Sequence, residues 1–212
     1  MESKKNKPSM RILKPFGPSV LQMTIPDETL KKLNQYVDEI VNDKDKSKQL
    51  DHGSDLAGNV NQEFFLETEF MKNIKWAEFL ASACTEWVKH EQNKQLNKFQ
   101  ITKSWIVRQF KHEYNPIHWH SGHISGVGYL KVPNTFGNTY QENKTNNNGK
   151  LVLVHGSRNL FSQSTFIIKP KVGDFYLFPS YLMHTVYPFY DTDEERRSIS
   201  FNARLDENAS SY

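Results

Sequence analysis

The sequence has very little cysteine and no long apolar run. Its 212 residues include one cysteine, Cys84, which excludes an internal disulfide framework and a cysteine-based zinc cluster. Scarce thiols fit a reducing compartment, so we expect a cytoplasmic protein. No stretch approaches the roughly 20 apolar residues of a transmembrane helix. Mean hydropathy is also low, at −0.70, and we therefore expect no membrane segment.

The charge gives little sign of a nucleic-acid partner. The formal net charge is only +3, and the lysines are scattered rather than gathered in one stripe. The first nine residues are basic and contain no apolar segment, so we expect a short disordered leader rather than a secretory signal. The remaining residues, 10–212, are enough for one domain with a real hydrophobic core.

The hydrophobic pattern changes along the chain. Residues 10–98 predict short strands and two helices, at 26–41 and 71–94, with a polar loop at 43–59 between them. Residues 99–205 follow a period of two instead. The strands expected there are 101–110, 115–120, 124–132, 150–155, 163–169, 173–179, 183–188 and 196–204.

Eight short strands suit a double-stranded β-helix, the jelly roll built from two antiparallel sheets. The predicted fold class is therefore α+β and mainly β, with residues 99–205 as the jelly-roll core. Residues 10–98 supply flanking strands and helical support, and we expect their helices to pack on one sheet.

The stretch PIHWHSGHISGVGYL, at 116–130, holds three histidines within six positions. Residues i and i+2 of a strand point to the same face, so His118 and His120 point together and Trp119 points away. This is a simple way to place two imidazoles on one metal ion. The same pair is a weak signal alone, because histidines also occur as polar residues of loops.

A metal site needs a third ligand from elsewhere in the chain. The best candidate is His184, in the apolar strand near the end of the β half, and His123 is the alternative. Three ligands leave coordination positions open for substrate or oxygen, as in non-haem iron sites with two histidines and a carboxylate. With His120 where such sites have the carboxylate, the centre here would be all-histidine.

The strand EERRSISFNARL, at 194–205, has one polar and one mostly apolar face. Its alternation places Arg196, Ser198, Ser200 and Asn202 together, and Arg197, Ile199, Phe201 and Ala203 on the opposite side. A guanidinium inside a barrel needs a carboxylate partner, because an unpaired buried charge is costly. That partner is either internal, at Asp174 or Glu195, or an acidic cosubstrate held in a pocket.

Three blocks, taken in order, resemble a known family. NPIHWHSGHISGVGYLKVP, VGDFYLFPSYLMHTVYP and ERRSISFN are similar to the Fe(II)- and 2-oxoglutarate-dependent oxygenase superfamily, and within it to a subgroup from marine bacteria and phages. The resemblance covers about residues 115–204. It implies a dioxygenase of cytoplasmic location, in the host cytoplasm if a phage encodes it.

The resemblance also implies roles for individual residues. His118, His120 and His184 would bind Fe(II); Arg196 and Ser198 would hold the distal carboxylate of 2-oxoglutarate, with Tyr129 hydrogen-bonded to the same cosubstrate. The reaction would convert 2-oxoglutarate, oxygen and substrate into succinate, carbon dioxide and a hydroxylated product. Hydroxylation is favoured over halogenation, since the His120 imidazole would fill the space for a halide. The substrate would be a protein, a peptide or a small molecule.

Two other functions agree with parts of the pattern. A cupin-type dioxygenase with three histidine ligands shares the histidines but needs neither 2-oxoglutarate nor Arg196 inside the barrel. A non-catalytic jelly roll that binds a metal or a carbohydrate would form no succinate. Dependence on 2-oxoglutarate separates the proposed enzyme from both.

Overall fold

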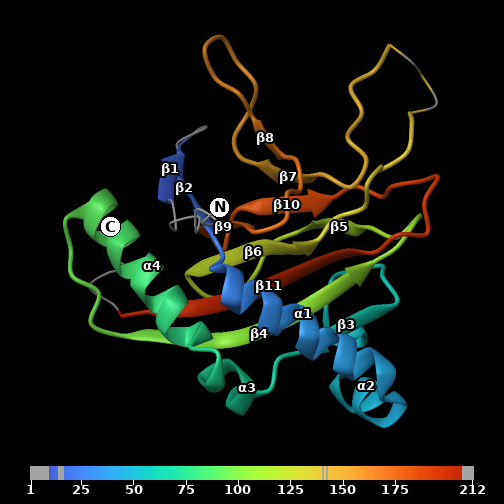
Figure 1. The fold of residues 1–212 in the computed structure, drawn as a ribbon. Coiled ribbons are helices and arrows are strands. Elements are labelled where there is room, and N and C mark those ends of the chain that lie inside the picture. Colours follow the sequence, from blue (N-terminus) through green and yellow to red (C-terminus); the bar gives the residue numbers. More distant parts are fainter. Residues whose placement is uncertain (1–9, 14–16, 140, 142, 207–212) are drawn as a thin grey trace, which may run out of the picture.

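The structure is a computed structural model that describes residues 10–13, 17–139, 141 and 143–206. The expected leader lies outside these residues. Two antiparallel sheets face each other: a seven-stranded sheet in the order β1-β2-β9-β6-β11-β4-β3 and a four-stranded sheet in the order β5-β10-β7-β8. The long helices α1 and α4 lie along the other side of the larger sheet (Figure 1).

The eight predicted strands of the β half are all present, and they divide equally between the two sheets. Their bounds are β4 Phe99–Gln109, β5 Asn115–His118, β6 Ile124–Lys131, β7 Leu151–Val154, β8 Thr165–Ile168, β9 Asp174–Pro179, β10 Met183–Val186 and β11 Arg196–Leu205. The jelly-roll prediction is confirmed. Three strands from the N-terminal part extend the larger sheet: β1 Met10–Leu13, β2 Val20–Thr24 and β3 Gln62–Phe65.

The outer face of the larger sheet carries the main hydrophobic core. Helices α1 (Asp27–Asn42) and α4 (Trp76–Gln92) bury their apolar stripes against it. The sheet has no side chains at Gly126 and Gly128, where a Cβ would lie 2.4 Å from the Phe201 ring and 2.2 Å from the Phe175 ring. These glycines let the two aromatic rings pack flat on the sheet. Within the described chain, no helix is both long and apolar enough to cross a membrane.

The inner face of the larger sheet, opposite the four-stranded sheet, is more polar. A smaller apolar cluster closes one part of the space between the sheets, including Leu151, Leu153 and Phe178. The antiparallel pairing aligns Ser198 with Val107 of β4 and with Tyr129 of β6, so these side chains share that face. The predicted polar face of β11 therefore lines the interior of the jelly roll.

Two predictions about the helical half were wrong. The segment 43–59 is not a continuous loop, because Lys44–Leu50 form helix α2; the Asp43 carboxylate caps it by accepting from the backbone N–H groups of Asp45 and Lys46, each at 3.0 Å. The helix expected at 71–94 is also interrupted. Helix α3 (Thr68–Asn73) ends before Lys75, whose left-handed backbone (φ 57°) starts a new direction for α4.

Candidate metal centre

Two neighbouring strands of the smaller sheet place the first two histidines opposite each other. Strand β5 pairs with β10, and His118 is the partner of His184 in that register. Pro116 lies in β5, which can accept a proline because it is the edge strand of its sheet. The apolar strand β10 buries His184 against the Phe178 ring, with the two ring centroids 5.0 Å apart.

Backbone carbonyls orient both of these imidazoles. The Nδ1 atom of His118 lies 2.7 Å from the Pro116 carbonyl oxygen, and that of His184 lies 2.9 Å from the Leu182 carbonyl oxygen. A carbonyl only accepts, so each Nδ1 carries the proton and each Nε2 keeps a free lone pair. Protein metal sites commonly fix a histidine ligand in this way.

His120 completes the cluster from the segment that follows β5. Its ring centroid lies 4.9 Å from that of His118 and 5.0 Å from that of His184, and the Trp105 ring packs against its edge. One ligand atom from each of the three histidines lies within 4.8 Å of the others. Three imidazole nitrogens at this separation can share one transition-metal ion.

The environment keeps the three imidazoles neutral near neutral pH. Burial lowers the pKa of His118; it lowers the pKa of His184 to about 4, with His118 adding to the effect. For His120, burial lowers the pKa to about 3, and repulsion from His184, His118 and Lys103 in their protonated forms adds to the effect. Metal binding requires unprotonated imidazoles, so the cluster needs no proton release to accept an ion.

One cavity contains the three histidines together with an arginine and a serine of β11. His118, His120 and His184 line it together with Arg196 and Ser198. The Arg196 side chain is only 1% exposed, and its Nη1 lies 3.5 Å from the Ser198 hydroxyl. Residues far apart in the sequence therefore meet around one enclosed space, as the pattern of three blocks predicts.

Several polar atoms beside this cavity have no hydrogen-bond partner within the described part of the chain. They are the Nε and Nη2 atoms of Arg196 and the hydroxyl of Tyr129. The guanidinium carbon lies 5.1 Å from the Tyr129 ring centroid, and burial lowers the Arg196 pKa and raises that of Tyr129 to about 12. Unpaired buried donors are costly. A carboxylate between Arg196, Ser198 and Tyr129 would satisfy them, so these residues fit one end of 2-oxoglutarate.

The internal ion pair considered for Arg196 is not formed. Glu195 instead accepts hydrogen bonds from Arg197 and Arg108, both at 2.7 Å from its Oε1. Asp174 lies 3.3 Å from the Tyr176 hydroxyl. The reason is strand parity, since Glu195 and Arg197 share the outer face of the sheet while Arg196 points inward.

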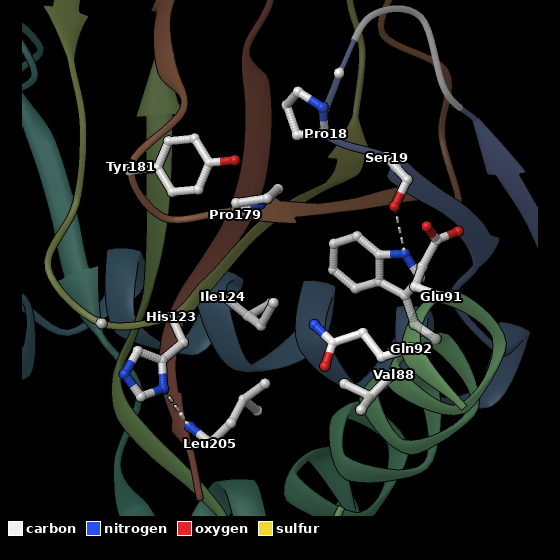
Figure 2. A pocket seen from close by; sticks show the side chains of 13 residues that line it. Pro18, Ser19, Val88, Glu91, Gln92, His123, Ile124, Pro179, Tyr181 and Leu205 are labelled. Atoms are coloured by element: carbon white, nitrogen blue, oxygen red, sulfur yellow. Dashed lines mark hydrogen bonds between the residues drawn. The ribbon is translucent and has the colours of Figure 1, made fainter. Parts of the chain in front are cut away.

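His123, the alternative ligand, lies in a different pocket. Its Nδ1 accepts a hydrogen bond of 2.9 Å from the Leu205 backbone N–H. Figure 2 shows its ring beside Leu205 and Ile124, across from Val88 and Gln92 of α4. Neither His118 nor His184 lines that pocket. The structure thus brings together three of the four histidines considered and separates the fourth.

A second, more open cavity adjoins the histidines. It has a volume of about 260 Å³, and its lining includes His118, His120, Trp119 and Glu63. The Trp119 side chain, predicted to point away from the metal, is 66% exposed at this cavity. Glu63 was not anticipated as a site residue, because a single acidic residue in a short edge strand gives no distinguishing sequence signal.

The fold and the histidine cluster together define a jelly-roll protein with a candidate metal site between its sheets. Residues 103–202 match the model of the family described as "Putative 2OG-Fe(II) oxygenase". Over these residues the chain is similar to the 2OG-Fe(II) oxygenases, whose cofactors are Fe(II) and 2-oxoglutarate. No curated protein sequence matches the chain.

Several solved structures share this fold. A prolyl-4-hydroxylase from Pseudomonas putida is 14% identical with a TM-score of 0.54, covering 87% of this chain and 92% of its own. A Trichoplax adhaerens prolyl hydroxylase in complex with a hypoxia inducible factor peptide fragment is 15% identical (TM-score 0.53; 95% and 85% covered). HygX from Streptomyces hygroscopicus with nickel, 2-oxoglutarate and hygromycin B bound is 10% identical (TM-score 0.54; 87% and 82% covered). Similarity at this level establishes the fold.

Proposed function

We propose that the protein is a hydroxylase in which His118, His120 and His184 bind Fe(II) and Arg196 binds 2-oxoglutarate. One observation carries the proposal: a single cavity joins the three imidazoles to a buried guanidinium that has two unpartnered nitrogen atoms. A metal-binding jelly roll without 2-oxoglutarate would need no such arginine. When bound, the iron and the cosubstrate supply the oxidising chemistry.

The protein contributes binding, orientation and exclusion of water. The carbonyls of Pro116 and Leu182 hold the His118 and His184 rings with Nε2 free for the metal. The guanidinium of Arg196 offers planar, charged donors that match a carboxylate. The Ser198 and Tyr129 hydroxyls complete the pocket for that carboxylate. Burial strengthens each of these interactions because water competes less for the donors.

The His120 imidazole has a specific consequence for the metal. Three neutral ligands leave the centre one charge more positive than two histidines and a carboxylate do. We therefore propose weaker Fe(II) binding than in centres with the carboxylate, and hydroxylation rather than halide transfer, because the ring occupies the position a halide would need.

A protein or peptide is the substrate class that we propose. The prolyl hydroxylases named above share the fold, and one of them was determined with a peptide fragment. HygX shares it too and was determined with hygromycin B. The fold therefore supports a peptide without selecting it.

Anaerobic titration with Fe(II) and 2-oxoglutarate tests the proposal. The wild-type protein should develop a weak visible charge-transfer band, and aerobic turnover should form succinate. His184→Ala should lose both, whereas His90→Ala, at an exposed position of α4, should keep both. No band in the wild type, or an undiminished band in His184→Ala, would falsify the assignment.

A further inference from the structure

One buried carboxylate beside the candidate metal centre has no hydrogen-bond partner among the residues that the structure describes. Glu63 is 1% exposed, and neither of its carboxylate oxygens makes a hydrogen bond. It lies in strand β3, where its pairing with Val107 places it on the inner face of the larger sheet. Burying an ionisable group without a partner is costly, so the position calls for an explanation.

The surrounding residues do not satisfy this carboxylate. Neighbouring Glu113 is itself an acceptor, engaged by the Asn61 and Phe110 backbone N–H groups and by the Asn61 side chain. The chain passes close above Glu63 at Gly58, where a Cβ would lie 2.9 Å from both carboxylate oxygens. Burial, and then the negative charges of Asp51 and Glu113, raise the pKa of Glu63 to about 7.

Glu63 is one of the residues that line the open cavity, together with His118 and His120. A molecule in that cavity would lie beside His118 and His120 and close to Glu63. Lys103 also lines the cavity, with its Nζ over the Phe65 ring at 5.4 Å. Because Lys103 is exposed, solvent screens its charge more than that of Glu63.

We infer that this cavity binds the substrate and that the Glu63 carboxylate receives a cationic nitrogen group of it, an ammonium or a guanidinium. The inference rests on the proposed function and narrows its substrate class. A cationic donor provides both the missing hydrogen bonds and the opposite charge. The group can come from a basic side chain of a peptide or from a small amine or guanidine. The exposed Trp119 gives the rest of the substrate an apolar surface at the entrance.

Matched probes can test the charge preference. Butylguanidinium and its neutral isostere butylurea are titrated into the anaerobic Fe(II)–2-oxoglutarate protein at pH 8, with valerate as the anionic probe. Broadening of the probe methylene signals by Fe(II), relative to the Zn(II)-loaded protein, locates the probe near the metal. We expect butylguanidinium to bind roughly tenfold more tightly than butylurea and valerate, since hydrogen bonds to charged groups are worth about that much.

Variants connect the preference to Glu63. Glu63→Gln should abolish the tenfold preference, while Asp55→Asn, which removes a carboxylate of the exposed rim of the same cavity, should change it less than twofold. Capped Gly-Arg-Gly and Gly-citrulline-Gly peptides form a second arm. A larger difference between the peptides than between the small probes identifies a peptide as the source of the cation, and a smaller one identifies a small molecule.

The metal-dependent visible band separates the possible failures. Absence of the band in the wild type contradicts the proposed function itself. A normal band with no preference for butylguanidinium, with tighter binding of valerate, or with equal effects of Glu63→Gln and Asp55→Asn overturns the inference alone. Loss of the band in Glu63→Gln also overturns it, because Glu63 would then belong to the metal centre.

Discussion

Two adjacent arginines of β11 lie in opposite environments. Arg197, on the outer face, is 2% exposed and bonds Glu195 as well as Asn34 and Asp38 of α1. Arg196, on the inner face, is 1% exposed and has two unpartnered nitrogens. Both are buried charges, so burial alone does not distinguish them. The outer arginine finds its hydrogen-bond partners within the folded protein, and this difference supports the proposal that a bound carboxylate supplies those of the inner one.

The same contrast holds for two buried carboxylates. Burial would raise the pKa of Glu195, but hydrogen bonds from Arg197 and Arg108 lower it. Glu63 has no such partner, and its pKa is raised. In these two comparisons the paired charges face the helices, and the unpaired charges face the cavities between the sheets. Each prediction below tests one side of this division.

The largest expected effect is on stability, at Arg197. Arg197→Met leaves the buried Glu195 with fewer partners and cuts the ion pair to Asp38. Breaking a buried pair costs about 3–5 kcal/mol, and we expect the free energy of unfolding to fall by this amount in urea titrations. Arg204→Met, at an exposed position of the same strand, is the control and should change stability by less than about 0.5 kcal/mol. Equal stability of the two variants would contradict the structural role.

Arg196→Met should have the opposite profile. We expect the Kd for 2-oxoglutarate, read from the visible band, to rise roughly 100-fold, because truncating a buried charged partner costs about 2–5 kcal/mol of binding. The free energy of unfolding should stay equal or increase, since an unpaired buried charge is removed. Destabilisation similar to that of Arg197→Met, with unchanged 2-oxoglutarate affinity, would show that the two arginines play the same role.

The alternation of residues predicted much of this division. Parity placed Arg196 and Ser198 on one face of the strand and Arg197 on the other, and it predicted that His118 and His120 point together. These inferences need only the period of a strand and the antiparallel pairing of a jelly roll. Side-chain partners from other elements were not predictable. The bonds from Arg197 to Asn34 and Asp38 depend on where α1 crosses the sheet.

The missed elements lacked a local signal. Helix α2 has few apolar residues and is started mainly by the Asp43 cap, so its hydrophobic period is too weak to detect. The break before α4 occurs at Lys75, with no glycine or proline to mark it. Glu63 becomes notable only because Gly58 lies over its carboxylate and Glu113 is otherwise engaged. Each of these features depends on contacts between segments.

The third prediction concerns the pH dependence of stability at Glu63. Its pKa is about 7 in the folded protein and about 4.5 unfolded, so folding takes up a proton between these values. Its contribution is fully present below pH 4.5 and is lost as the pH rises through 7. In the metal-free protein, the stability of Glu63→Gln relative to wild type should therefore increase by roughly 2–3 kcal/mol from pH 4.5 to pH 8.5.

Paired Glu195 provides the matched comparison for that experiment. Its pKa is lowered, so its favourable contribution is retained as the pH rises over this range and is lost only on acidification. Glu195→Gln relative to wild type should accordingly show no gain between pH 6 and pH 8.5, in urea titrations at each pH. A flat difference for Glu63→Gln over the same range would mean that Glu63 is not the unpaired carboxylate described.

The smallest predicted effect separates two serines on the inner face of β11. The Ser198 hydroxyl lies 3.5 Å from Nη1 of Arg196. Ser200 lies two residues further along the same strand. Ser198→Ala should raise the Kd for 2-oxoglutarate about three- to tenfold, the value of one neutral hydrogen bond, and should leave Fe(II) binding unchanged. Ser200→Ala should raise it less than twofold. Because both substitutions remove one hydroxyl from the same cavity wall, equal effects would mean that the cosubstrate carboxylate is not held at the position of Arg196.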